Sequence, residues 1–203
     1  EMAPYSDIDL LFLFPYKQTP RGEQMVEYIL YLLWDLGVKV GHSTRSTADC
    51  VRLAKQDLTI RTALLEARFL WGDQALFLEF RATFQERVVS GTAVEFVDGK
   101  LAERNERHIK LGDSRYLVEP NVKDGKGGLR DLQTLFWIAK YTYQVDNVSE
   151  LVAHGVLSDD EARNFAKDQN FLWTVRFHLH YLADRAEERL TFDLQTRLAE
   201  RMN

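Results

Sequence analysis

The sequence predicts an α+β fold in which a small mixed sheet with flanking helices is followed by a helical lobe. Three observations support this prediction. Residues 8–14 are almost uniformly apolar, residues 23–43 read as a helix followed by a second strand, and residues 147–203 carry helical patterns throughout. The 203 residues are 45% hydrophobic and 28% charged, which is typical of a globular protein with one large core or two small ones.

The predicted first strand, residues 6–14, joins two carboxylates to an apolar run. Pro4 and Pro15 bracket it, and its apolar side chains fall on both faces of a period-two pattern, which predicts a central strand covered on both sides. Asp7 and Asp9 leave the same face, with Cα atoms about 6.5 Å apart. Such a pair can share one Mg²⁺, which proteins hold by one or two carboxylates together with waters and substrate phosphates.

A second interpretation of the same two acids is structural. An isolated pair of aspartates at this spacing more often marks only the exposed beginning of a strand. Buried strands, however, seldom carry two acids on one face unless the acids are paired or bind a metal. Because apolar residues follow Asp7 and Asp9 immediately, the pattern favours a metal site.

The next residues predict a β-α-β unit. Residues 19–22 predict a turn after the first strand. Residues 23–36 repeat apolar side chains at helical spacing, and Gly37 indicates the end of this helix. Residues 38–43 predict the second strand. A helical connection of this length fits parallel pairing of the two strands.

Most of the remaining chain is predicted to be helical. Ser46 and Thr47 indicate a helix start, and residues 67–71 predict a third short strand that ends at Gly72. Residues 74–89 predict a helix with an apolar stripe in the core. Residues 95–110 predict a helix whose alternating charges face solvent.

A capping-box pattern at Ser158 and Glu161 predicts the start of a long helix in the C-terminal region. His178 and His180 lie two residues apart on that helix, so their side chains diverge by about 200° and cannot share one metal ion. We expect both imidazoles to lie at the surface or between helices.

A glycine-rich loop precedes the predicted helix 129–143. It has three glycines within four positions, and its cations are Lys123, Lys126 and Arg130. A flexible loop with many backbone donors, leading into a helix N-terminus, is suited to bind phosphate. The order of residues matches neither a P-loop nor a dinucleotide fingerprint. A plain interdomain turn, locked to the helical lobe by Arg130 and Asp131, is therefore an equally good interpretation.

Composition limits the partners and the compartment. The formal net charge of −5 argues against DNA or RNA as a partner, because nucleic-acid binding needs a basic surface. The single cysteine, Cys50, excludes an internal disulfide framework and fits a reducing compartment. No signal peptide and no apolar run long enough for a membrane span occur, so we expect a cytoplasmic protein. The chain opens on Glu-Met, and we expect it to be a fragment of a longer protein.

The segment 1–11 resembles the second half of the nucleotidyltransferase signature of the DNA polymerase β superfamily. In that superfamily a Gly-Gly or Gly-Ser turn lies upstream of the strand with the two aspartates, and that turn is not in this chain. The superfamily places a third carboxylate on the next strand, where this sequence has Gly41 and His42. The nearest acids are Asp49, Asp57 and Glu66.

A second resemblance covers essentially the whole chain. Residues 119–133 and 137–140, residues 62–68 with Gly72, and residues 190–195 closely resemble the bifunctional uridylyltransferase/uridylyl-removing family of nitrogen regulation. The resemblance implies Mg²⁺-dependent transfer of UMP from UTP to a tyrosine of the PII signal protein. It also implies an N-terminally truncated nucleotidyltransferase core over residues 1–115 and a loop with a helical lobe over residues 116–203. We expect the HD and ACT domains of the family to lie outside the 203 residues considered.

The resemblance assigns roles to six residues. Asp7 and Asp9 are expected to hold the metal and to be catalytic. The residues expected to bind the nucleotide are Ser6, Lys123, Lys126 and Arg130. The alternatives are a related protein adenylyltransferase, a stand-alone nucleotidyltransferase, and a non-catalytic module of the same fold that docks a partner.

Overall fold

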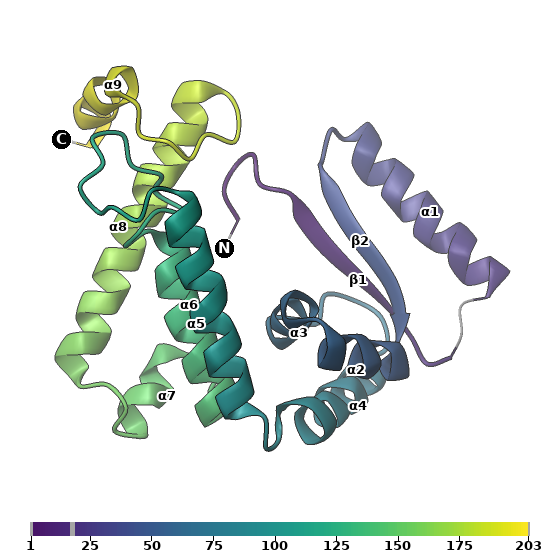
Figure 1. Cartoon of the computed structure of the whole chain (residues 1–203). Helices are drawn as coiled ribbons and strands as arrows, with labels where there is room; N and C mark the ends of the chain where they lie inside the picture. The colour runs from purple at the N-terminus through teal and green to yellow at the C-terminus, as the bar shows by residue number, and fades with distance from the viewer. Residues whose placement is uncertain (1, 17–18, 203) are drawn as a thin grey trace. The chain divides into compact units, whose positions relative to one another are not determined.

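A computed structural model of the chain describes residues 2–16 and 19–202. These residues form two compact units (Figure 1). The strand unit comprises Ser6–Ala93, and the helical unit comprises residues 2–5 with residues 94–202. The compact units divide after Ala93, whereas the predicted domain boundary lies after residue 115. Among the described residues, no helix is both long and apolar enough to cross a membrane.

The strand unit opens with the predicted β-α-β element. Strand β1 (Ile8–Phe14) pairs in parallel with β2 (Val40–Ser46), and helix α1 (Pro20–Asp35) connects them (Figure 1). The helix starts where the sequence allows it, because the Thr19 side chain accepts a hydrogen bond from the Gly22 amide and Pro20 occupies the first turn. After the helix, Gly37 adopts a left-handed conformation with φ 75°. The parallel crossover is confirmed.

The prediction that the first strand is central is wrong for the part of the chain that the structure describes. In that part β1 has a single partner, β2, and the sheet has two strands. The side chains of β1 are half-buried, apart from the exposed Asp9. A continuous apolar run indicates burial on two faces, but it does not specify how many strands lie beside it.

Three helices complete the strand unit near the C-terminal ends of the strands (Figure 1). They are α2 (Thr47–Gln56), α3 (Leu58–Leu65) and α4 (Gln74–Phe84), and α4 continues into one π-helical turn, η1 (Gln85–Val89). The predicted helix start is confirmed, because the Ser46 side chain accepts a hydrogen bond from the Asp49 amide at 3.1 Å. The predicted apolar stripe is confirmed at Phe80, Phe84 and Val88, all of which are buried.

The predicted third strand over residues 67–71 is wrong. These residues form no strand, and the aromatic side chains of Phe69 and Trp71 are exposed. Aromatic and aliphatic residues favour a strand only where a neighbouring strand completes the hydrogen-bond ladder. Here the segment links α3 to α4.

The buried thiol of Cys50 lies in the core of the strand unit. It is completely inaccessible, and burial raises the pKa of the thiol to about 11. We expect a thiol reagent at about pH 8 to leave the native protein unmodified, because the reactive thiolate is scarce and covered. In denaturant the reagent should modify one thiol, in line with the single cysteine of the sequence. Rapid stoichiometric reaction of the native protein would contradict this packing.

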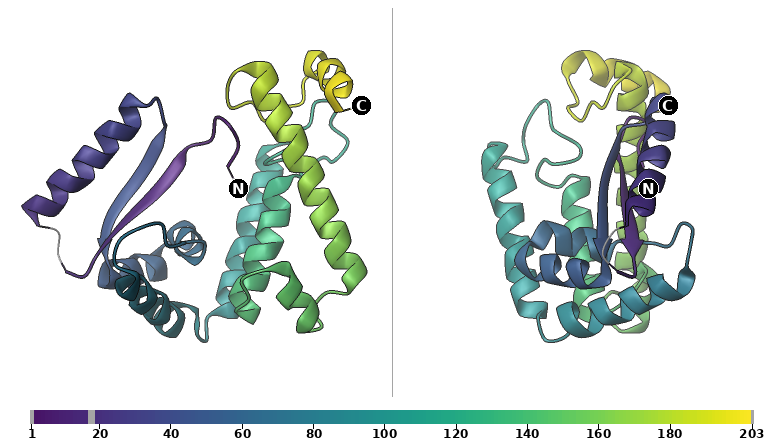
Figure 2. Two further views of the ribbon diagram at one scale, coloured as in Figure 1. Left: turned by 180° about the vertical axis from the view of Figure 1, so that it is seen from behind. Right: turned by 90° about the vertical axis from the view of Figure 1, so that its right-hand side faces the viewer.

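The helical unit contains α5 (Ala93–Lys110), α6 (Leu129–Tyr143), α7 (Val148–Ala153), α8 (Asp159–Ala183) and α9 (Phe192–Met202). Helices α5, α6 and α8 run beside one another (Figure 2). Phe96 of α5 stacks on Tyr141 of α6 with ring centroids 3.9 Å apart, which explains why α5 belongs to this unit. The predicted capping box at Ser158 and Glu161 is confirmed.

Candidate functional site

The two candidate metal-binding aspartates lie at the beginning of β1. Asp7 immediately precedes the strand and Asp9 is its second residue, and both side chains are exposed. Asp9 is in register with Gly41 of β2. A Cβ atom on Gly41 would lie only 2.5 Å from Asp9 Oδ1. Glycine at position 41 therefore provides the space that the Asp9 carboxylate occupies.

This pair fits the ligand preference of Mg²⁺. Two exposed carboxylates two residues apart leave coordination positions for waters and for phosphate oxygens, which is how proteins usually bind this ion. The described residues contain no group of three His, Cys, Asp or Glu side chains that would by itself form a metal site. Any Mg²⁺ bound here would consequently depend on oxygens from substrate and solvent.

Two of the acids considered as a third carboxylate have structural roles. The side chain of Asp57 accepts the Ile60 amide at 2.9 Å and caps α3. Asp49 accepts hydrogen bonds from Arg52 and from the Ser46 hydroxyl, and these bonds hold the pKa of its carboxyl below the usual value. His42 is exposed on β2. Ser6, which is half-buried, lies next to Asp7 in the sequence.

The glycine-rich loop is held by its own backbone. The Asn121 side chain accepts the amides of Lys123 and Asp124 at 3.0 and 2.7 Å, and the Asn121 carbonyl accepts the amide of Gly125 at 3.0 Å. Such an Asx turn fixes the first half of the loop locally.

The backbone amides in the second half of the loop also donate hydrogen bonds within the protein. The amides of Gly128, Leu129 and Arg130 donate to the carbonyls of residues 125, 122 and 123, at 2.9, 3.0 and 2.8 Å. The Gly127 amide donates to Asp131 Oδ2 at 2.8 Å. The expectation that these amides are available to bind phosphate is wrong, because each of them already donates to an acceptor within the protein. Phosphate bound at this loop would have to contact mainly side chains.

Asp131 connects this loop to helix α5. Its carboxylate accepts Arg107 at 2.5 Å and lies 3.0 Å from His108 Nε2. Arg107 also donates to the carbonyl of Asp124 in the loop, at 3.1 Å. The alternating charges of residues 95–110 predicted a solvated face, so the roles of Arg107 and His108 were not predicted. Nothing in the charge pattern separates the half-buried Arg107 and the buried His108 from their exposed neighbours.

Each of the three predicted nucleotide-binding cations pairs with an acid of the helical unit. Lys123 Nζ lies 3.8 Å from Glu188, Lys126 Nζ lies 2.9 Å from Asp113, and Arg130 Nε lies 3.5 Å from Asp124. The Arg130 guanidinium also lies over the ring of Trp137, 5.5 Å from its centroid. The partner of Lys126 is the most exposed of the three acids, so this pair is the one that solvent screens most.

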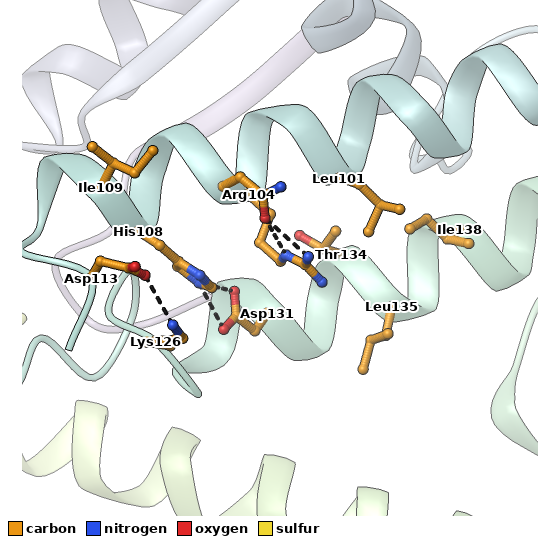
Figure 3. A pocket seen from close by; sticks show the side chains of 11 residues that line it. Leu101, Arg104, His108, Ile109, Asp113, Lys126, Asp131, Thr134, Leu135 and Ile138 are labelled. Atoms are coloured by element: carbon orange, nitrogen blue, oxygen red, sulfur yellow. Dashed lines mark hydrogen bonds and ion pairs between the residues drawn. The ribbon is translucent and has the colours of Figure 1, made fainter. Parts of the chain in front are cut away.

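A pocket of about 660 Å³ lies between α5 and α6 in the helical unit (Figure 3). Two polar pairs, His108 with Asp131 and Lys126 with Asp113, point toward it from one end. The rest of the lining combines aliphatic side chains, among them Leu101, Leu135 and Ile138, with the polar side chains of Arg104, Asn105 and Thr134. The pocket therefore places Lys126, one of the predicted cations, beside the carboxylate that anchors the loop.

Comparison with known proteins gives matches along the entire chain. The family model described as GlnD PII-uridylyltransferase matches residues 95–203. The chain is 65% identical over 202 residues, 100% of its length, to a bifunctional uridylyltransferase/uridylyl-removing enzyme of Azospirillum brasilense. It is 63% identical over 202 residues, again 100% of its length, to the enzyme of that name from Rhodospirillum rubrum. Over 201 residues, 99% of its length, it is 61% identical to that from Rhodopseudomonas palustris.

The matched region is a limited part of those proteins. The chain spans 22% of the length of each of the three curated relatives. No solved structure matches the chain significantly.

Proposed function

The chain belongs to the GlnD PII-uridylyltransferase family, and on that premise we propose that it is part of an enzyme that transfers UMP from UTP to a tyrosine of the PII protein. The observation that carries the choice of reaction is the 65% identity along the chain to an enzyme whose name states uridylyl transfer. The room that Gly41 leaves for the Asp9 carboxylate supports a metal-binding role for β1.

The proposed reaction is a displacement at phosphorus. The tyrosine oxygen attacks the α-phosphorus of UTP, the bond to the bridging oxygen breaks, and pyrophosphate leaves. Asp7 and Asp9 would hold Mg²⁺, which when bound supplies positive charge to the phosphate oxygens. Ser6 would lie at the nucleotide through its position beside Asp7. The work of the protein is then mainly positioning and neutralising charge.

Nucleotide binding by the chain tests this proposal. Thermal unfolding is followed with UTP or ATP, each with and without Mg²⁺, and ligand binding to the folded state raises the midpoint. The proposal expects a rise with UTP and Mg²⁺ together that is larger than the rise with ATP. A preference for ATP would instead support a protein adenylyltransferase. No response to either nucleotide would overturn the catalytic proposal and favour a module that docks a partner.

The loop cations supply a second test. We propose that Lys126 exchanges Asp113 for a phosphate oxygen of UTP, because this lysine is partly exposed and its present partner is the most solvated. Lys126→Ala should then fold normally and weaken UTP binding by about 1–3 kcal/mol, as for the loss of a charge-assisted hydrogen bond. UTP titrations at fixed Mg²⁺ measure the difference.

Lys110→Ala is the matched control, since Lys110 is an exposed lysine of α5. Equal UTP affinities of Lys126→Ala and the control would remove Lys126 from nucleotide binding. If Lys126→Ala also had a lowered unfolding midpoint, the lysine would be a scaffold residue that holds the loop through Asp113.

A further inference from the structure

The segment that precedes the two aspartates, residues 2–5, packs on the helical unit; we call it the strap. Ala3 is 4% exposed and belongs to a buried cluster with Leu129 and Trp173. Leu129 is the first residue of α6, directly after the glycine-rich loop. One residue of the strap, Ala3, is thus part of a core that also contains the first residue after the loop, whereas Met2, Pro4 and Tyr5 are exposed.

Tyr5 makes two polar contacts that fix the end of the strap. Its backbone amide donates to Nδ1 of His180 at 3.3 Å, and its hydroxyl donates to the carboxylate of Asp184. The Tyr5 and His180 rings also lie close, with centroids 6.1 Å apart. Both partners belong to the C-terminal end of α8, some 175 residues away in the sequence.

The contact with the Tyr5 amide requires one tautomer of the His180 imidazole. An amide can only donate, so Nδ1 must be unprotonated, and the proton of the neutral ring lies on Nε2. That nitrogen lies 3.5 Å from Glu188 Oε1. Glu188 is in turn held by Arg176, whose Nε and second amino group donate to it at 2.9 and 2.7 Å. His180 is fully buried, so this arrangement leaves little freedom to the ring.

The acceptor of the Tyr5 hydroxyl, Asp184, has a backbone conformation that few residue types tolerate. Asp184 caps α8 in the left-handed region with φ 54°, a conformation that Asp and Asn tolerate better than other residues with a side chain. Its hydrogen bond with Tyr5 raises the pKa of the tyrosine hydroxyl, because the bond stabilises the protonated donor.

The strap leads directly to the metal-binding pair. Tyr5 and Asp7 are two residues apart, so their Cα atoms are at most about 7 Å apart, however the chain turns at Ser6. We propose that the strap, through Tyr5 on His180 and Asp184, is a positioning device for the carboxylates of Asp7 and Asp9. This inference rests on the proposed function, because it gives the strap a role in the Mg²⁺-dependent binding of UTP.

Glu188 links the strap to the glycine-rich loop. It faces His180, its backbone carbonyl accepts the Val122 amide at 2.8 Å, and its carboxylate lies 3.8 Å from Lys123. The elements that hold the strap therefore also hold the start of the loop. Loss of the Tyr5 side-chain contacts weakens the restraint on the aspartates, and the amide bond from Tyr5 to His180 remains.

The test is a Mg²⁺ titration of UTP binding by the full chain. Tyr5→Ala removes the hydroxyl and the ring, and Tyr5→Phe removes the hydroxyl alone. If the undocked strap does not support metal binding, the apparent Mg²⁺ affinity falls with the docked fraction. We expect the Mg²⁺ concentration for half-maximal UTP binding to rise about five- to tenfold in Tyr5→Ala and about two- to fivefold in Tyr5→Phe.

Two controls separate positioning from general stability. Asp184→Asn keeps an acceptor in the left-handed conformation and should bind Mg²⁺ as the wild type does. Tyr116→Ala removes a tyrosine that is 87% exposed and should have no effect. The unfolding midpoint of every variant is recorded in parallel. A positioning role moves the Mg²⁺ dependence of Tyr5→Phe while its midpoint stays close to that of the wild type.

The outcomes distinguish the two proposals. If wild type binds UTP with Mg²⁺ and both Tyr5 variants do so equally well, the strap has no positioning role and the proposed function stands. A lowered midpoint with an unchanged Mg²⁺ dependence also overturns the inference, because the strap would then be structural only. If wild type itself shows no Mg²⁺-dependent UTP binding, the proposed function fails, and the inference fails with it.

Discussion

Asp9→Asn is expected to remove the Mg²⁺-dependent part of UTP binding while the protein stays folded. The amide has nearly the shape of the carboxylate, so the space left by Gly41 still fits it, but the charge that would bind Mg²⁺ is gone. We expect at least about a tenfold loss of apparent Mg²⁺ affinity, because even outer partners of a metal site are worth that much. The unfolding midpoint should stay the same or rise slightly, since a like-charge repulsion with Asp7 is relieved.

Gly41→Ala tests the same carboxylate without changing its charge. The added methyl would lie 2.5 Å from Asp9 Oδ1, so the Asp9 side chain must turn away. Because the obstructed atom is the end of a rotatable side chain, the fold should tolerate the change. Mg²⁺-dependent UTP binding should weaken in this variant too.

Glu27→Gln serves as the control, since it removes one exposed acid from α1 and leaves β1 untouched. UTP is titrated at several Mg²⁺ concentrations for the wild type and the three variants. Wild-type Mg²⁺ dependence in both Asp9→Asn and Gly41→Ala would contradict the assignment of this metal site.

Gly128→Ala is expected to cause a large loss of stability. A Cβ atom there would lie 2.8, 2.9 and 3.0 Å from the carbonyl oxygens of Val122, Lys123 and Gly125. Two of those carbonyls also accept the amides of Leu129 and Arg130. Backbone atoms cannot rotate away as a side chain can, so the turn must open. We expect a cost of about 3 kcal/mol or more, from overpacking together with weakened hydrogen bonds.

Gly127→Ala is the matched comparison one residue earlier. Gly127 has open space around its Cα but a φ of 81°, so alanine there meets only backbone strain. This costs about 1–2 kcal/mol. Urea unfolding of the full chain, followed by tryptophan fluorescence, measures both variants. A Gly128→Ala variant as stable as Gly127→Ala would show that the loop does not have this packing.

Local sequence signals predicted the elements that depend on neighbouring residues. Helix α1 follows from its apolar spacing, the Ser46 and Ser158 caps from side chains that accept nearby amides, and the helix at Leu129 from the glycines before it. In each case the hydrogen-bond partners lie within a few residues, so composition and spacing are sufficient. The sequence also placed Asp7 and Asp9 at the start of β1, and their role in metal binding stays a prediction.

Features that depend on distant partners were decided by the tertiary structure. Residues 67–71 have strand-forming side chains but no strand beside them, and β1 pairs on one side in the described part of the chain. The glycine-rich loop uses its amides internally, because Asn121 and Asp131 supply acceptors that its glycine pattern does not reveal.

The same distinction applies to the candidate site. The sequence by itself identified Asp7, Asp9 and the loop cations as chemically suited to a metal and to phosphate. Only the tertiary structure showed that Gly41 makes room for Asp9 and that Tyr5 is held by His180 and Asp184. Strand register and packing between helices select partners far apart in the chain. No local pattern encodes that choice, because it depends on the free energy of the whole folded unit.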